Sequence, residues 1–235
     1  MTAAANKLIY LAKRNPKFNH EQFLRRWRQH GALAMQQSFF SGLSRYAQCD
    51  AVKPPAGLKT SADYDGVGLC WFRDLKPFPP EEAERMRADE LETFSEYVRP
   101  FVVMCEESVL KPGRGFVKAS VFIVRKPGTA PEAFARHWRE VHGPMMLAQE
   151  SLQPLLAGYI QNRAVVTDRT KGSRMEYDGV AEFHFSSLEH MGRFFTESAK
   201  IEALGRDSEQ FLDRGRTLFM CTNEVVLYDA AELAA

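Results

Sequence analysis

The residues with the clearest capacity for chemistry lie two apart in one apolar run of the chain. Glu182 and His184 alternate there with Ala181, Phe183 and Phe185. Successive side chains of a strand point to opposite faces, so the acid and the imidazole share one face while the apolar residues pack under helices. A carboxylate and an imidazole on one face can polarise or hold the oxygens of a substrate and move its protons.

A second candidate is His142, which precedes Gly143 and Pro144, a sequence typical of a helix end. A histidine at a helix C-terminus has a purely structural interpretation, because the negative end of the helix dipole favours its charged form. The pair His30-Gly31 recurs at the corresponding place earlier in the chain, and this repetition favours a role at the mouth of a pocket. Imidazole titrates close to neutral pH, so His142 is the candidate for moving a proton.

These candidates lie in a sequence that contains an internal duplication. Phe23 and Trp27 in the first copy correspond to Phe134 and Trp138 in the second. Tyr64-Asp65-Gly66-Val67 corresponds to Tyr177-Asp178-Gly179-Val180. Phe94 and Glu107 correspond to Phe211 and Glu224. The offsets grow slowly and fall on rare residue types, as expected of a duplication. We therefore expect two domains, residues 1–113 and 114–235, joined in the turn-rich stretch 111–115.

Each half has the pattern of a βαββαβ unit. In the first half, strands are expected at 8–12, before 67 and at 67–72 and 102–110, with helices around Phe23 and at 80–94. In the second half, strands are expected at 119–124, before 180 and at 180–185 and 218–228, with helices around Phe134 and at 187–211, the latter broken at Gly205. One such unit covers only one face of its sheet with helices, so the two sheets must bury their other faces against each other. The expected fold is α+β: tandem ferredoxin-like units forming an intramolecular dimeric α+β barrel, with a ligand inside the barrel.

The interior of this barrel also receives the matched strand residues Tyr46, Tyr159 and Gln161. Tyr159 would donate a hydrogen bond to a developing oxyanion, while Tyr46, Gln161 and His30 would contact the substrate. The alternative is that the tyrosines are ordinary half-buried strand aromatics with their hydroxyls in water.

The two halves differ at the interior positions of one strand. Leu69 and Trp71 in the first half correspond to Glu182 and His184 in the second, so we expect the functional pocket in the second half. Trp71, together with Phe116, would shape an aromatic slot. The matched Glu107 and Glu224 could orient a histidine or face solvent.

Composition excludes several classes of function. The 235 residues carry 31 Lys+Arg and 30 Asp+Glu, a formal net charge of +1, with no long basic run. This balance argues against binding to nucleic acid or to an anionic membrane. No apolar run approaches the roughly 20 residues that span a bilayer, and the start lacks the apolar segment of a signal peptide. The four cysteines lack CxxC spacing, so we expect a cytoplasmic protein.

No glycine-rich phosphate loop, dinucleotide-binding pattern or zinc-type cluster is present in the sequence, so we expect neither a cofactor nor a metal. One alternative stays open: His142, Glu182 and His184 could form a facial triad for iron if the fold brought them together.

The helix run from Phe134 to Pro144 (FARHWREVHGP), followed by the strand run from Tyr177 to Phe185 (YDGVAEFHF), resembles the EthD-domain family. The first half departs from the pattern: one residue is missing before His30, and Ala32 and Leu69 stand where the second half has Pro144 and Glu182. The resemblance covers nearly the whole chain as two tandem domains and implies a dimeric α+β barrel. It also implies cofactor-independent chemistry on small aromatic or polyketide-like molecules, with the family's helix-end histidine at His142.

Two classes of function follow. The leading hypothesis is a lyase, decarboxylase, cyclase or isomerase that uses general acid–base catalysis on an enolisable or phenolic substrate. The alternative is a non-catalytic accessory protein of an oxygenase or catabolic pathway, which shields a hydrophobic intermediate. Both predict a small, aromatic or hydrophobic partner, and a homodimer stays open. A pure interaction scaffold is disfavoured, because buried acids and imidazoles are costly without a task.

Overall fold

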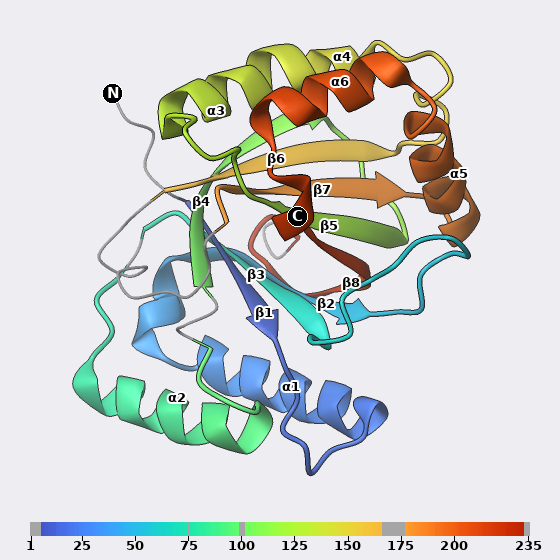
Figure 1. The fold of residues 1–235 in the computed structure, drawn as a ribbon. Coiled ribbons are helices and arrows are strands. Elements are labelled where there is room, and N and C mark those ends of the chain that lie inside the picture. Colours follow the sequence, from blue (N-terminus) through green and yellow to red (C-terminus); the bar gives the residue numbers. More distant parts are fainter. Residues whose placement is uncertain (1–5, 75, 99–101, 166–176, 233–235) are drawn as a thin grey trace.

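The fold is that of a computed structural model, which describes residues 6–74, 76–98, 102–165 and 177–232 (Figure 1). The first half contains β1 (Lys7–Ala12), α1 (His20–Met35), β2 (Leu43–Ala51), β3 (Gly66–Phe72), α2 (Pro80–Thr93) and β4 (Val102–Lys111). The second half contains β5 (Val117–Ile123), α3 (Pro131–His137), a π-helical turn (Trp138–His142), α4 (Gly143–Leu147), β6 (Gly158–Ala164), β7 (Gly179–Phe185), α5 (Leu188–Ser198), α6 (Glu202–Phe211) and β8 (Leu218–Asp229). Each half thus has the expected βαββαβ order.

The strands close into a single antiparallel barrel in the order β1-β3-β2-β8-β5-β7-β6-β4. The seams between the halves are β2–β8 and β4–β6, and exchanging the halves maps one seam onto the other, as a pseudo-two-fold axis requires. Closure leaves no unpaired sheet edge. The intramolecular α+β barrel expected from the duplication is confirmed.

Helices cover the outside of the barrel on two opposite sides. In Figure 1, α1 and α2 lie together below the strands, and α3, α4 and α6 lie above them. Phe23 and Trp27, one helical turn apart on α1, pack into the core between α1 and its sheet, and Phe134 and Trp138 do so in the second half. Among the described residues, no helix has the length and apolar character needed to cross a membrane.

The helix that carries His142 does not end there. It passes through the π-helical turn and continues as α4, with Pro144 in the first turn of α4. His30 likewise lies inside α1, which ends at Met35. The helix-end interpretation of both histidines is therefore wrong.

The π-helical turn accommodates the one residue by which the second half is longer. Trp27 and Trp138 are 111 positions apart, whereas His30 and His142 are 112 apart. A π turn takes up one extra residue inside a helix, so both histidines keep the same relation to the sheet.

The predicted break at Gly205 is also misplaced. The chain turns at Ala199–Ile201, and α6 runs through Gly205. A glycine costs a helix only about 1 kcal/mol, and burial of Leu204 and Phe211 on either side of it holds α6 together.

Candidate functional site

The barrel interior has an apolar tier and a charged tier. On β7, Val180, Glu182 and His184 face the interior, as the alternation predicted. The apolar tier is a buried cluster at one end of the barrel: Ile9, Leu11, Ala47, Cys49, Val67, Leu69, Val103, Cys105, Phe122, Val180 and Met220. The charged tier lies toward the end where β7 and β8 finish.

Two buried lysines organise the charged tier. Lys7 donates to Glu107 at 2.7 Å and to Glu182, and Lys118 donates to Glu182 at 2.8 Å and to Glu224 at 2.5 Å. Both lysines have no solvent exposure. The sequence analysis missed them, although Lys7 and Lys118 are a matched pair at the start of matched strands.

This network fixes the charge states. Burial alone would raise the pKa of Glu182, but Lys118 and Lys7 hold that pKa well below its usual range. Lys118 and Arg45 likewise overcome burial and lower the pKa of Glu224 to about 2. Burial and the nearby Lys118 lower the pKa of His184 to about 4, so His184 is neutral at neutral pH.

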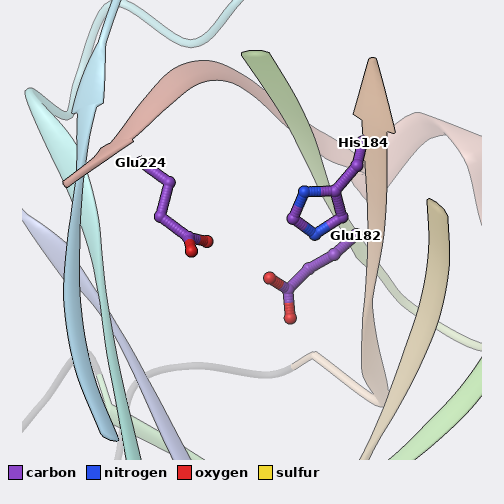
Figure 2. A group of neighbouring side chains, drawn as sticks. All are labelled: Glu182, His184 and Glu224. Atoms are coloured by element: carbon purple, nitrogen blue, oxygen red, sulfur yellow. The ribbon is translucent and has the colours of Figure 1, made fainter. Parts of the chain in front are cut away.

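Figure 2 shows the side chains of Glu182, His184 and Glu224 turned toward one another. One nitrogen or oxygen atom of each lies within 4.8 Å of the others. These residue types suit a divalent metal, but Nζ of Lys118 contacts both carboxylates and takes the place of a cation. A metal would have to displace a fully buried ammonium from both partners, so the cluster does not fit a resident metal. The alternative iron triad with His142 does not form, because His142 packs among the helices outside the barrel.

Trp71 belongs to the same network. Its ring lies 4.3 Å from Nζ of Lys7 and 4.6 Å from the Arg45 guanidinium, and its indole N–H donates to Glu107 at 2.8 Å. Glu107 and Glu224 therefore pair with cations and orient no histidine directly. Phe116, predicted to share an aromatic slot with Trp71, is 83% exposed.

A cavity of about 670 Å³ opens at this end of the barrel, and Trp71, Glu182 and His184 line it. Nδ1 of His184 is buried and has no hydrogen-bond partner among the residues that the structure describes. A role of Glu182 and His184 in holding a substrate stays a prediction.

The tyrosines predicted to face the interior lie on the other side of the sheet. Tyr46 is paired with Cys70, and Tyr159 with Phe183, and all four pack under the helices. The amide of Gln161 donates to the Tyr159 hydroxyl at 2.8 Å and to the Trp138 carbonyl at 2.9 Å. Both interpretations of the sequence are wrong here, since the hydroxyls reach neither the barrel interior nor bulk water.

Between the helices and the sheet, each half contains a histidine paired with an aspartate. Nδ1 of His30 lies 2.6 Å from Asp89, and Nδ1 of His142 lies 2.8 Å from Asp207. His137 contacts the second oxygen of Asp207 at 2.8 Å. Although burial opposes it, hydrogen bonds from His30 and Arg26 lower the pKa of Asp89 to about 2. Burial lowers the pKa of His142 and outweighs the opposing effect of Asp207.

A phenylalanine completes each histidine site. The ring of Phe94 lies 5.1 Å from that of His30, and Phe211 lies 5.1 Å from His142. Isolated β-bridges pair Arg14 with Phe94 in the first half and Arg125 with Leu212 in the second. Because Arg14 and Arg125 correspond in the duplication, the residue that occupies the position of Phe94 in the second half is Leu212, one residue after Phe211. Both rings nevertheless pack on the histidine.

The first half combines this histidine–aspartate pair with a large cavity. The cavity measures about 730 Å³ between the sheet and α1 and α2. Its lining is mainly apolar and aromatic: Leu8, Tyr10, His30, Ala34, Phe39, Phe40, Tyr46, Cys70, Phe72, Phe78, Ala83, Met86, Arg87, Glu90, Tyr97, Val98 and Val102. We call it the sheet–helix cavity. The first half therefore has a cavity of its own, and the expectation that the functional pocket lies in the second half stays a prediction.

Comparison with known proteins agrees with this fold. The family model for the EthD domain matches residues 126–215. This match lies within the second half of the chain and covers less than half of the 235 residues. The dimeric α+β barrel expected from the resemblance is confirmed, whereas a second EthD domain in the first half stays a prediction.

Solved structures share the barrel at low sequence identity. A protein provisionally assigned as a chlorite dismutase has a TM-score of 0.51 and 10% identity, over 97% of this chain and 96% of that one. A provisionally assigned monooxygenase from Lactobacillus acidophilus NCFM has a TM-score of 0.47 and 11% identity, over 94% of this chain and 93% of that one. The first likeness concerns the fold alone, and the second is too distant to carry an argument. No curated protein matches the sequence.

Contrasts between the second half and the first half could have located the cavity. Cys70 and Tyr10 of the first half correspond to Phe183 and Val121 of the second half. Cys70 is smaller than Phe183, which indicates space in the first half. Tyr10 carries a hydroxyl that Val121 lacks, which indicates a polar group there. The sequence analysis did not use these pairs, nor the matched Asp89 and Asp207.

Proposed function

We propose that the sheet–helix cavity binds a small aromatic molecule with an enolisable carbonyl or a phenolic hydroxyl, and that His30 moves its proton. One observation carries the proposal: His30, fixed by Asp89, lies in the wall of an apolar cavity of about 730 Å³. Apolar walls with a few convergent polar groups are typical of small-molecule sites.

Asp89 gives His30 a defined orientation. The carboxylate is ionised at neutral pH because its pKa is about 2, and it occupies Nδ1 of the ring. A ligand in the cavity would then meet Nε2. An ionised partner at Nδ1 also stabilises the imidazolium that forms when Nε2 takes up a proton.

Tyr10 and Tyr46 provide a hydrogen-bond donor for a substrate oxygen. Their hydroxyls lie 3.1 Å apart; Trp27 donates to Tyr10 at 3.0 Å, and Gln48 donates to Tyr46 at 2.8 Å. One hydroxyl proton serves the bond between the tyrosines, which leaves the other for a ligand. Burial raises the pKa of both phenols, so both stay protonated and able to stabilise an oxyanion.

The test uses the aromatic ketone 2-tetralone in D2O, with NMR following exchange of hydrogen for deuterium beside the carbonyl. The wild-type protein should accelerate exchange, and His30→Asn should lower the acceleration by ~10²–10⁴-fold. His142→Asn is the matched control and should stay close to wild type.

Two outcomes contradict the proposal. Loss of exchange in His142→Asn but not in His30→Asn would return the proton-handling role to the histidine that the sequence analysis favoured. Binding of 2-tetralone without any acceleration of exchange would favour the non-catalytic accessory role.

A further inference from the structure

We propose that Glu90 is a second catalytic residue of the sheet–helix cavity, the base that takes a proton from substrate carbon while His30 serves the substrate oxygen. This inference rests on the proposed function and assigns the two proton transfers to two residues. It starts from the placement of Asp89 and Glu90, which are neighbours on α2 and reach different surroundings.

Asp89 turns away from the cavity and Glu90 turns into it. Asp89 is bound by His30 and Arg26, and it is absent from the cavity lining. Glu90 lines the cavity and accepts the backbone N–H of Val98 at 3.2 Å through one carboxylate oxygen. That bond fixes the side chain and leaves its second oxygen for a ligand.

The surroundings of Asp89 and Glu90 shift the pKa values of their carboxyl groups in opposite directions. Asp89 is held ionised as the partner of His30, with a pKa of about 2. Burial raises the pKa of Glu90, and this outweighs the opposing effects of His30 and the Val98 N–H. A carboxylate with a raised pKa is a stronger base than an exposed one, and paired carboxylates with separated pKa values are a recurring mark of acid–base sites.

The charged and titratable neighbours of Glu90 come from three segments. His30 lies on α1, Asp89 and Arg87 lie on α2, and Tyr97 follows α2. Arg87 packs against the Tyr97 ring at 5.2 Å and lies at the exposed side of the cavity. Tyr10 and Tyr46 of the sheet line the same cavity, but burial raises the pKa of both phenols and keeps them protonated. His30 is the imidazole that shares the cavity wall with Glu90.

The proton transfers balance without any further reactant. The Glu90 carboxylate takes a proton from the carbon beside a carbonyl, and the C–H electron pair becomes the new C=C bond. The carbonyl electrons move to oxygen, which takes the Nε2 proton of a His30 that starts as the imidazolium, with the Asp89 carboxylate as its counter-charge. The products are an enol, a protonated Glu90 and a neutral His30, and reversal of the same steps regenerates the site.

The second half shows that the histidine–aspartate pair does not need a glutamate. Asp207 corresponds to Asp89, and the next residue is Ser208, whose hydroxyl donates to the Leu204 carbonyl at 2.8 Å. The pair thus forms equally well beside a serine. Glu90 occurs in the half that has the cavity, as a functional role would require.

The experiment compares Glu90→Gln with Glu92→Gln in the 2-tetralone exchange assay across pH. Glu92 lies on the same helix and pairs with Lys17 at an exposed position outside the cavity. Glu92→Gln therefore removes the same charge as Glu90→Gln without changing the cavity. Glu90→Gln should lower exchange by ~10²–10⁴-fold, retain 2-tetralone binding and lose the acid limb of the pH–rate curve. Glu92→Gln should keep the wild-type rate and both limbs.

A second measurement does not depend on activity. The side-chain carboxyl of Glu90, assigned in the ¹³C NMR spectrum by its loss in Glu90→Gln, should titrate above the ordinary range for glutamate and shift when 2-tetralone is added. A wild-type pH–rate profile in Glu90→Gln, with His30→Asn inactive, would overturn this inference and leave the proposed function standing. No exchange by the wild-type protein would overturn both.

Discussion

The rings of Phe183 and Tyr159 stack with centres 4.6 Å apart and planes at 9°. In the first half, the corresponding pair is Cys70 and Tyr46, and both line the sheet–helix cavity. The same fold therefore keeps a filled core beside His142 and an open cavity beside His30. Phe183, together with Phe194 and Phe195 of α5, fills this region of the second half.

Replacing Cys70 by phenylalanine should narrow the sheet–helix cavity beside Tyr46. In Cys70→Phe, the new ring can stack on Tyr46 as Phe183 does on Tyr159, so burial of apolar area offsets the displacement of neighbours. We expect the free energy of unfolding to change by less than about 1 kcal/mol, with loss of 2-tetralone binding in NMR titrations. Undiminished binding would show that the ligand lies elsewhere.

The reciprocal change, Phe183→Cys, should open a cavity in the core of the second half. Removing a buried phenyl ring costs about 3–5 kcal/mol, because the surrounding side chains collapse only partly. Urea unfolding measures this loss. If the new cavity is accessible, 2-tetralone should restore part of the stability, since a ligand of the folded state stabilises it by mass action. A loss below about 1 kcal/mol would mean that Phe194 and Phe195, which contact Phe183, refill the space.

Glu182 should matter strongly for stability. It is fully buried, bonded to Lys7, Lys118 and Asn162, and ionised. Glu182→Gln leaves two buried ammonium groups short of a negative partner, and breaking a buried ion pair in this way costs about 3–5 kcal/mol. Glu106→Gln, which breaks a partly exposed pair with Arg163, is the control and should cost under about 1 kcal/mol. Similar losses in the two variants would contradict the role given to the lysines.

The fold was predictable because duplication and alternation are local properties of the sequence. The repeat led to the two units, and the pattern of β7 put Glu182 and His184 inside the barrel. The direction of Tyr46 was not predictable in this way. Its neighbours Ala47 and Cys49 are small and suit either face, and the register with β3 decides the outcome. The pairing of His30 with Asp89 joins α1 to α2 across 59 positions, a contact that only the tertiary structure creates.

His184 should make stability depend on pH between about 4 and 6.5. Its pKa in the folded protein is about 4, below the 6.5 of an exposed histidine, so the unfolded chain binds more protons over this range. Stability should therefore rise with pH here, and it should fall as the pH is lowered from 7 to 5, by roughly 2 kcal/mol from this residue. Glutamine does not titrate in this range. In His184→Gln, the free energy of unfolding measured with urea should therefore differ between pH 7 and pH 5 by roughly 2 kcal/mol less than in the wild type. His190→Gln, which alters a half-buried histidine bonded to Ser186 outside the charged tier, is the control. An unchanged pH dependence in His184→Gln would mean that His184 takes up a proton in the folded barrel as readily as in water, contrary to its burial beside Lys118.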